Sequence, residues 1–109
     1  MIDLARLTPD AVVVIFHARH DPEEEGYAAT SERLSTMVAD APGFLGMESL
    51  REGEASLTVS YWASEDEVRD WQQQMEHLEA QERGRLEWYR DYQVVVARSM
   101  RQYGLERDR

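Results

Sequence analysis

Two short runs of the sequence are apolar at every position, and they restrict what this chain can fold into more than any other feature. The runs are Val12-Val13-Val14-Ile15-Phe16 and Val94-Val95-Val96-Ala97. Unbroken runs of β-branched residues indicate strands buried on both faces, because the side chains of a strand point alternately to its two sides. The chain has 109 residues, which is the size of one domain. It therefore has little material with which to cover both faces of a sheet.

Signals for helices and for two further strands lie between these runs. Asp21-Pro22 followed by three Glu residues is typical of a helix start, and Pro42-Gly43 ends that helix. Gly53 lies in a predicted hairpin turn, and Ser64 with Glu67 fits a capping box at the start of a second helix. The expected elements are a strand at 12–16, a helix over 21–41, strands over 44–51 and 56–62, a helix from 64 to about 89 with a break near 74–75, and a strand over 92–100.

This order, β-α-β-β-α-α-β, predicts an α+β domain with a ferredoxin-like antiparallel sheet. In that topology all helices lie on one face of the sheet. We expect Phe16 and its alternate neighbours to face the helices, which leaves Ile15 and Val95 on a bare apolar face that monomers rarely carry. The sequence therefore predicts a homodimer in which two sheets pack face to face. We expect a single domain over 1–109, with its core at about 12–98 and extensions at 1–11 and 99–109.

The charge balance and the missing residue types exclude several classes of function. The chain has 22 acidic and 12 basic residues, a net charge of −10, which repels nucleic acid and anionic membranes. No apolar run approaches the roughly 20 residues of a membrane helix, and the first residues lack the pattern of a signal peptide. All basic residues are Arg, so a Lys Schiff base is excluded. Cys is absent, which excludes disulfides and thiolate sites and makes the cytoplasm the expected compartment.

One face of the predicted second helix holds residues that suit a ligand pocket. His77, Gly84 and Trp88 share this face, and Gln81 lies beside it. A Gly inside a helix costs about 1 kcal/mol relative to Ala, so Gly84 indicates a close approach by a ligand or by the sheet. Aromatic residues at helical spacing fit a packed core equally well. His17 and His20 do not share a face of a regular strand, and no metal site is predicted from them.

The second half of the chain resembles antibiotic biosynthesis monooxygenase-type domains, above all the small bacterial members that stand alone. The residues that carry the resemblance are Ser60-Tyr61-Trp62, Val68, Trp71, Glu76-His77, Ala80-Gln81, Gly84-Arg85, Trp88-Tyr89 and Tyr92. The resemblance spans roughly residues 12–98 and implies a dimeric α+β barrel, with a pocket between helices and sheet in each protomer. It is less specific for activity, because this superfamily holds unrelated functions on one fold.

Some of these relatives oxidise polycyclic phenols with dioxygen and without metal or flavin. The first functional hypothesis is therefore a cofactor-independent monooxygenase that acts on a flat, anthrone- or phenol-like molecule. In this hypothesis His77 is the base, and Gln81 and Arg85 stabilise the developing oxyanion. The residues expected to bind the substrate are Phe16, Tyr61, Trp71, Gly84 and Trp88.

Two alternatives stay open. Other relatives bind and degrade heme, and Trp71 matches a Trp that shapes their pocket. The position of their axial His is occupied here by Gln81, and His77 lies one turn earlier. The second hypothesis is thus a heme-binding or heme-degrading protein with His77 as the iron ligand. The third is a non-catalytic small-molecule-binding or biosynthetic helper protein that uses the same pocket.

Overall fold

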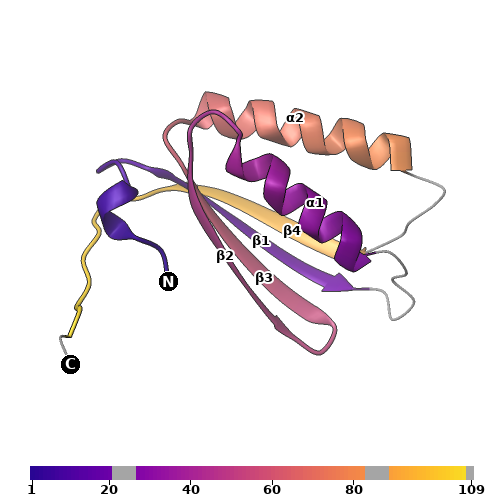
Figure 1. Cartoon of the computed structure of the whole chain (residues 1–109), viewed down its shortest axis with the longest axis horizontal. Helices are drawn as coiled ribbons and strands as arrows, with labels where there is room; N and C mark the ends of the chain where they lie inside the picture. The colour runs from indigo at the N-terminus through magenta and orange to yellow at the C-terminus, as the bar shows by residue number, and fades with distance from the viewer. Residues whose placement is uncertain (21–26, 83–88, 108–109) are drawn as a thin grey trace.

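The computed structural model describes residues 1–20, 27–82 and 89–107 (Figure 1). These residues hold one sheet, two α-helices and a short 3₁₀ turn. The elements are the 3₁₀ turn Leu4–Arg6, β1 (Val12–His20), α1 (Tyr27–Ala39), β2 (Phe44–Glu52), β3 (Ala55–Trp62), α2 (Glu65–Glu82) and β4 (Tyr89–Arg98). The predicted α+β class and the ferredoxin-like antiparallel sheet are confirmed.

The four strands lie in the order β2-β3-β1-β4, and all three pairings are antiparallel. Residues directly opposite each other share a face of the sheet, so the register assigns every strand residue to one side. Val12 lies opposite Trp62 on β3, and Phe16 lies opposite Val94 on β4. Val12 and Trp62 belong to the core that both helices cover, so we call this side the helix-facing side. The other side, which carries Val13, Ile15 and Val95, is called the outer face below.

The core joins one buried residue from each of four elements. Val12 of β1, Val38 of α1, Trp62 of β3 and Val68 of α2 form one cluster, and each is at most 5% exposed. The Phe44 ring meets the Trp62 ring edge-on at 5.4 Å. Because both helices contribute to this cluster, both cover the same face of the sheet. The prediction that Phe16 and its alternate neighbours face the helices is therefore confirmed by the register.

A corner between β2 and α2 fixes where the second helix begins. Ser64 Oγ accepts a long hydrogen bond of 3.4 Å from the Glu67 amide, as the predicted capping box requires. The amide of Ala63 donates to the Gly43 carbonyl oxygen at 2.8 Å. Gly43 has a φ of +76°, which only Gly adopts without strain, and the Glu67 carboxylate occupies the space next to its Cα. This corner holds α2 over the sheet.

The structure corrects the predicted ends of two strands and the predicted break in the second helix. β1 continues to His20, because residues 17–19 also pair with both neighbouring strands. β4 begins at Tyr89, where a register shift lets Tyr89 pair with His20, and it ends at Arg98. α2 runs without a break through 74–75, since no Gly or Pro interrupts its backbone there. The predicted start of the first helix, at 21–26, lies outside the described residues.

Candidate functional site

Aromatic side chains of β1 and β4 gather on the helix-facing side of the sheet. The rings of Phe16 and Tyr92 stack, with centroids 5.2 Å apart and planes 24° apart. The Tyr89 ring meets Phe16 edge-on at 5.4 Å and Tyr92 at 6.1 Å. Val94 lies opposite Phe16 and Val96 opposite Val14, so both continue this side along β4. We call Phe16, Tyr89, Tyr92, Val94 and Val96 the aromatic floor.

The floor lies at the edge of the sheet and is open to solvent. β4 is the last strand of the sheet, and its side chains Tyr92, Val94 and Val96 are 48%, 42% and 45% exposed. The core beside it, at Val12 and Trp62, is closed. An exposed strip of this kind offers a flat apolar surface on which the ring of a ligand can stack.

A buried imidazole closes one end of the floor. His20, the last residue of β1, is fully buried, and its Nε2 lies 2.7 Å from the Ser56 Oγ, which is also buried. Its ring meets the Tyr89 ring at 5.1 Å, and its backbone N–H donates to the Glu54 carbonyl oxygen at 2.7 Å. Tyr89 therefore connects His20 to the rest of the floor. Among the ring contacts of the described residues, the His20–Tyr89 contact brings an imidazole to the floor.

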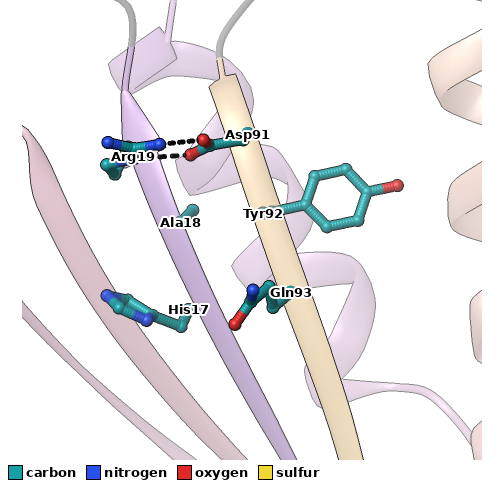
Figure 2. A pocket seen from close by; sticks show the side chains of 6 residues that line it. All are labelled: His17, Ala18, Arg19, Asp91, Tyr92 and Gln93. Carbon is teal, nitrogen blue, oxygen red and sulfur yellow. Dashed lines mark hydrogen bonds and ion pairs between the residues drawn. The ribbon is translucent and has the colours of Figure 1, made fainter.

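A polar depression of about 300 Å³ lies behind the floor, over the same strands (Figure 2). Arg19 and Asp91 face each other there and form two hydrogen bonds, while the Tyr92 ring projects away from them (Figure 2). The Arg19 guanidinium, by hydrogen bond and charge, holds the pKa of Asp91 below its usual value. His17 and Gln93, opposite each other, complete the polar end of the outer face. The sheet itself separates this depression from the floor.

The structure does not bring His77 to this site. Among the described side chains of α2, the apolar ones that are half-buried are Trp71, Met75 and Leu78, which follow Val68 along one stripe of the helix. His77 is exposed and lies nearly opposite Val68 around the helix axis. In the described protomer the apolar stripe of α2, and not the face that carries His77, meets the sheet. The assignment of His77 as the base stays a prediction.

The expected aromatic walls are also divided. Phe16 belongs to the floor, but Tyr61 lies opposite Val13 and so on the outer face. Tyr61 and Phe16 therefore lie on opposite faces of the sheet, and a role for Tyr61 in substrate binding stays a prediction. The Trp71 ring lies 6.1 Å from the Trp62 ring and packs against the core. This agrees with the alternative that aromatic residues at helical spacing form a packed core. The side chain of Gln81, and residues Gly84, Arg85 and Trp88, lie outside the described residues.

Sequence reasoning places Val94 and Val96 on the side of Phe16 but does not find His20 or the floor tyrosines Tyr89 and Tyr92. It considers His20 only as a metal ligand, together with His17. It predicts Tyr89 at the end of a helix, and this prediction hides the pairing of Tyr89 with β1. The signal that was available is the aromatic content of β4, where Tyr89 and Tyr92 directly precede the apolar run. No group of three His, Asp or Glu among residues 1–20, 27–82 and 89–107 is placed to hold a metal ion. In the same part of the chain, no helix is long and apolar enough to cross a membrane.

Comparison with known proteins identifies relatives of this fold. The family model described as antibiotic biosynthesis monooxygenase matches residues 11–83. The uncharacterised protein YqjZ of Bacillus subtilis strain 168 is 43% identical over 105 residues, which are 94% of this chain and 92% of YqjZ.

Solved structures of other proteins share this fold. SnoaB, a cofactor-independent oxygenase from Streptomyces nogalater, superposes with a TM-score of 0.64 at 18% identity, over 81% of this chain and 91% of its own. A protein of unknown function from Nitrosomonas europaea superposes with a TM-score of 0.63 at 13% identity, over 92% and 98% of the two chains. Likeness at these identities establishes a shared fold.

Proposed function

Since this chain belongs to the antibiotic biosynthesis monooxygenase family, we propose that it is a monooxygenase that oxidises a flat, electron-rich aromatic compound with dioxygen and without a cofactor. Anthrones and polycyclic phenols are the expected substrate class. The fold shared with SnoaB, a cofactor-independent oxygenase, supports the reaction type.

The observation that carries the proposal is the aromatic floor beside a buried imidazole. A planar substrate stacks on the exposed Tyr92 ring, which Phe16 supports from below at 5.2 Å. Aromatic stacking contributes about 1 kcal/mol beyond the burial of apolar area. Val94 and Val96 extend the apolar surface under the remaining rings of the substrate.

The chemistry needs few protein groups. Loss of a proton turns an anthrone into a delocalised anion, which transfers one electron to dioxygen, and the two radicals then combine at carbon. The resulting peroxide loses water to give the quinone. The substrate carbon loses two hydrogens and gains one oxygen atom, the second oxygen leaves as water, and all four electrons that reduce dioxygen come from the substrate. The protein contributes a base and a stacking surface.

Within this proposal, His20 replaces His77 as the proton acceptor. His77 stands on the exposed face of α2 and His17 on the outer face of the sheet, so neither ring reaches the floor. His20 contacts Tyr89 of the floor and is oriented by Ser56. Because its ring is fully buried, the Tyr89 ring has to turn aside for a substrate to contact it. Gln81 and Arg85 remain the proposed groups for the oxyanion.

The imidazole of the heme hypothesis does not lie on the floor. Ligation of heme iron by histidine needs an imidazole nitrogen that faces the iron, and His77 lies on the exposed face of α2. No step of the proposed reaction therefore involves heme.

We also propose that the protein acts as a homodimer formed through the outer face. On this face, Val95 of β4 is 56% exposed, Leu57 of β3 is 42% exposed and Leu50 of β2 is 77% exposed. Ile15 of β1 lies on the same face, between β4 and β3. A second copy of the sheet would cover these side chains. Obligate interfaces of this apolar kind commonly bury about 2,000 Å² or more.

Initial rates of dioxygen uptake with an anthrone, corrected for uptake without protein, test the proposed function. The protein, treated with a chelator and free of flavin, should turn over the substrate. Tyr92→Ala should lower kcat/KM by about 10-fold, because the stacking surface is lost. Met37→Ala, which removes an exposed apolar side chain of α1, is the matched control and should keep the full rate.

The choice of base has its own comparison. His20→Gln should lower kcat by about 100-fold or more, whereas His17→Gln on the same strand should not. If His77→Ala lowers kcat while His20→Gln keeps the full rate, the assignment of His20 as the base is wrong and His77 of α2 is the base. Uptake of dioxygen no faster than the blank across a panel of anthrones and phenols would refute the proposed function itself.

A further inference from the structure

The last described residues leave the domain as an extended segment. After β4 ends at Arg98, residues 99–107 form neither helix nor strand. Figure 1 shows this segment descending from the end of β4, away from the four strands, so that its last described residues lie clear of the sheet. We call residues 99–107 the C-terminal arm.

Contacts with the N-terminal segment set the course of the arm. The Ser99 amide donates to the Ala11 carbonyl oxygen at 2.8 Å. Gln102 Nε2 donates to the Thr8 carbonyl oxygen at 2.9 Å and lies 3.0 Å from Ser99 Oγ. Further along, a Cβ on Gly104 would lie 3.2 Å from Leu4 Cδ1. The arm is thus attached along one side to residues 4–11.

The other side of the arm is apolar and exposed. Met100, Tyr103 and Leu105 are 97%, 81% and 74% exposed, and the Arg101 guanidinium lies over the Tyr103 ring at 5.6 Å. Burial of each exposed apolar side chain would stabilise whatever assembly covers it. Three such side chains on one attached segment form a surface that a partner would cover.

The arm is attached on the outer-face side of the sheet. Ile2 Cδ1 lies 3.1 Å from where a Cβ on Gly46 would be, and Gly46 lies opposite Tyr61, on the outer face. The N-terminal segment therefore runs over this face at β2, and the arm is bound to that segment. Across the rest of the outer face, Leu57 and Val95 are uncovered. The arm and the bare face thus belong to one continuous surface.

The charges of the arm suit the same face of another copy. Arg101 and Arg107 outnumber Glu106 in the arm, although the chain as a whole carries a net charge of −10. Glu48 and Glu52 of β2 lie on the outer face, opposite Val59 and Ala55, and both are exposed. A basic segment attached to an acidic chain is attracted to a second acidic copy.

We propose that the C-terminal arm is a clasp that packs Met100, Tyr103 and Leu105 against a second copy of this chain. Two-fold symmetry makes the contact reciprocal, so that each protomer is held by the arm of the other. The inference rests on the proposed homodimer and adds a segment outside the sheet to its interface.

Sedimentation equilibrium of two chains tests the clasp. Replacing all three side chains, as M100S/Y103S/L105S, should raise the dimer dissociation constant by about 100-fold or more. Met37→Ser, an exposed apolar residue of α1 outside the arm and the outer face, is the control and should leave this constant unchanged. Circular dichroism of the triple variant should match that of the unsubstituted chain, because the arm has little contact with the core.

A second measurement does not depend on the stability of the variant. The chain has no Cys, so a photo-crosslinker attached to Tyr103→Cys reports what the arm touches. Adducts between two chains are expected, and adducts confined within one chain would overturn the clasp. A dimeric full chain whose dissociation constant the triple substitution does not change would refute the clasp and leave the homodimer standing. A monomeric full chain would refute the homodimer first, and the clasp with it.

Discussion

Gly43→Ala should destabilise the protein more than the same change at Gly53, although both positions have a positive φ. Gly43 has a φ of +76° and Gly53 a φ of +59°. A Cβ at Gly43 would overlap Glu67 Oε2, whereas a Cβ at Gly53 would meet nothing within 4 Å. The two substitutions therefore share the backbone strain, and only Gly43→Ala displaces a neighbour.

The magnitudes follow from these two effects. An alanine in the left-handed region costs about 1 kcal/mol, which is the whole expected effect of Gly53→Ala. At Gly43 the Glu67 carboxylate, whose Oε2 is buried, also has to move. Overpacking of this kind costs about another 1 kcal/mol, so Gly43→Ala should cost about 2 kcal/mol.

Denaturant unfolding at one fixed protein concentration measures these differences, and a double-mutant cycle isolates the contact. In a Glu67→Ala background, Gly43→Ala should cost no more than Gly53→Ala does, because nothing is left to displace. Equal costs for the two Gly substitutions in the unsubstituted chain would refute the reasoning. So would a cost at Gly43 that is independent of the side chain at position 67.

Three further predictions concern the outer face and the core. Val95→Glu should raise the dimer dissociation constant by at least about 100-fold in sedimentation equilibrium, because the symmetric interface would bury two unpaired carboxylates; a variant that still dimerises at micromolar concentration would contradict the interface. Asp91→Asn should lower the melting temperature at neutral pH but not in acid. The pKa of Asp91 in the folded state lies below the unfolded value of about 3.9. The stabilisation by Arg19 is therefore complete above the unfolded pKa and is lost as the pH falls through the lowered folded-state pKa. A difference in melting temperature that persists at about pH 2 would rule this out. Trp62→Ala, at a position only 1% exposed, should cost about 3–5 kcal/mol in denaturant unfolding, and a loss of less than about 1 kcal/mol would show that Trp62 is not central to the core.

The strands and the turn chemistry of the fold were readable from local sequence. The run at 12–16 marks β1, Gly53 marks the hairpin between β2 and β3, and Ser64 marks the start of α2. Each of these signals is local, since it depends on backbone preferences or on neighbours within four residues. The end of β1 was not readable, because His17 to His20 are polar or small and are held in the strand by pairing with distant residues.

The candidate site was harder to predict, because it depends on which faces meet. The sequence of α2 has an apolar stripe through Val68 and Trp71 and another plausible stripe through His77. Periodicity identifies both stripes but does not decide which one packs on the sheet. The same limit applies to Tyr61 in its strand. The local sequence predicts the strand but not which face Tyr61 occupies, because a shift of register by one residue moves a side chain to the other face. The aromatic floor itself required the pairing of Tyr89 with His20, between residues 69 positions apart.

The fate of the two atoms of dioxygen tests the proposed function most directly. With ¹⁸O₂, an anthrone substrate and no added metal or flavin, the quinone formed above the blank rate should contain one ¹⁸O atom, and the other should appear in water. The same label should appear in the product of Tyr92→Ala, but at about one tenth of the rate. Quinone whose new oxygen comes from water, or labelled product formed no faster than without the protein, would contradict the account.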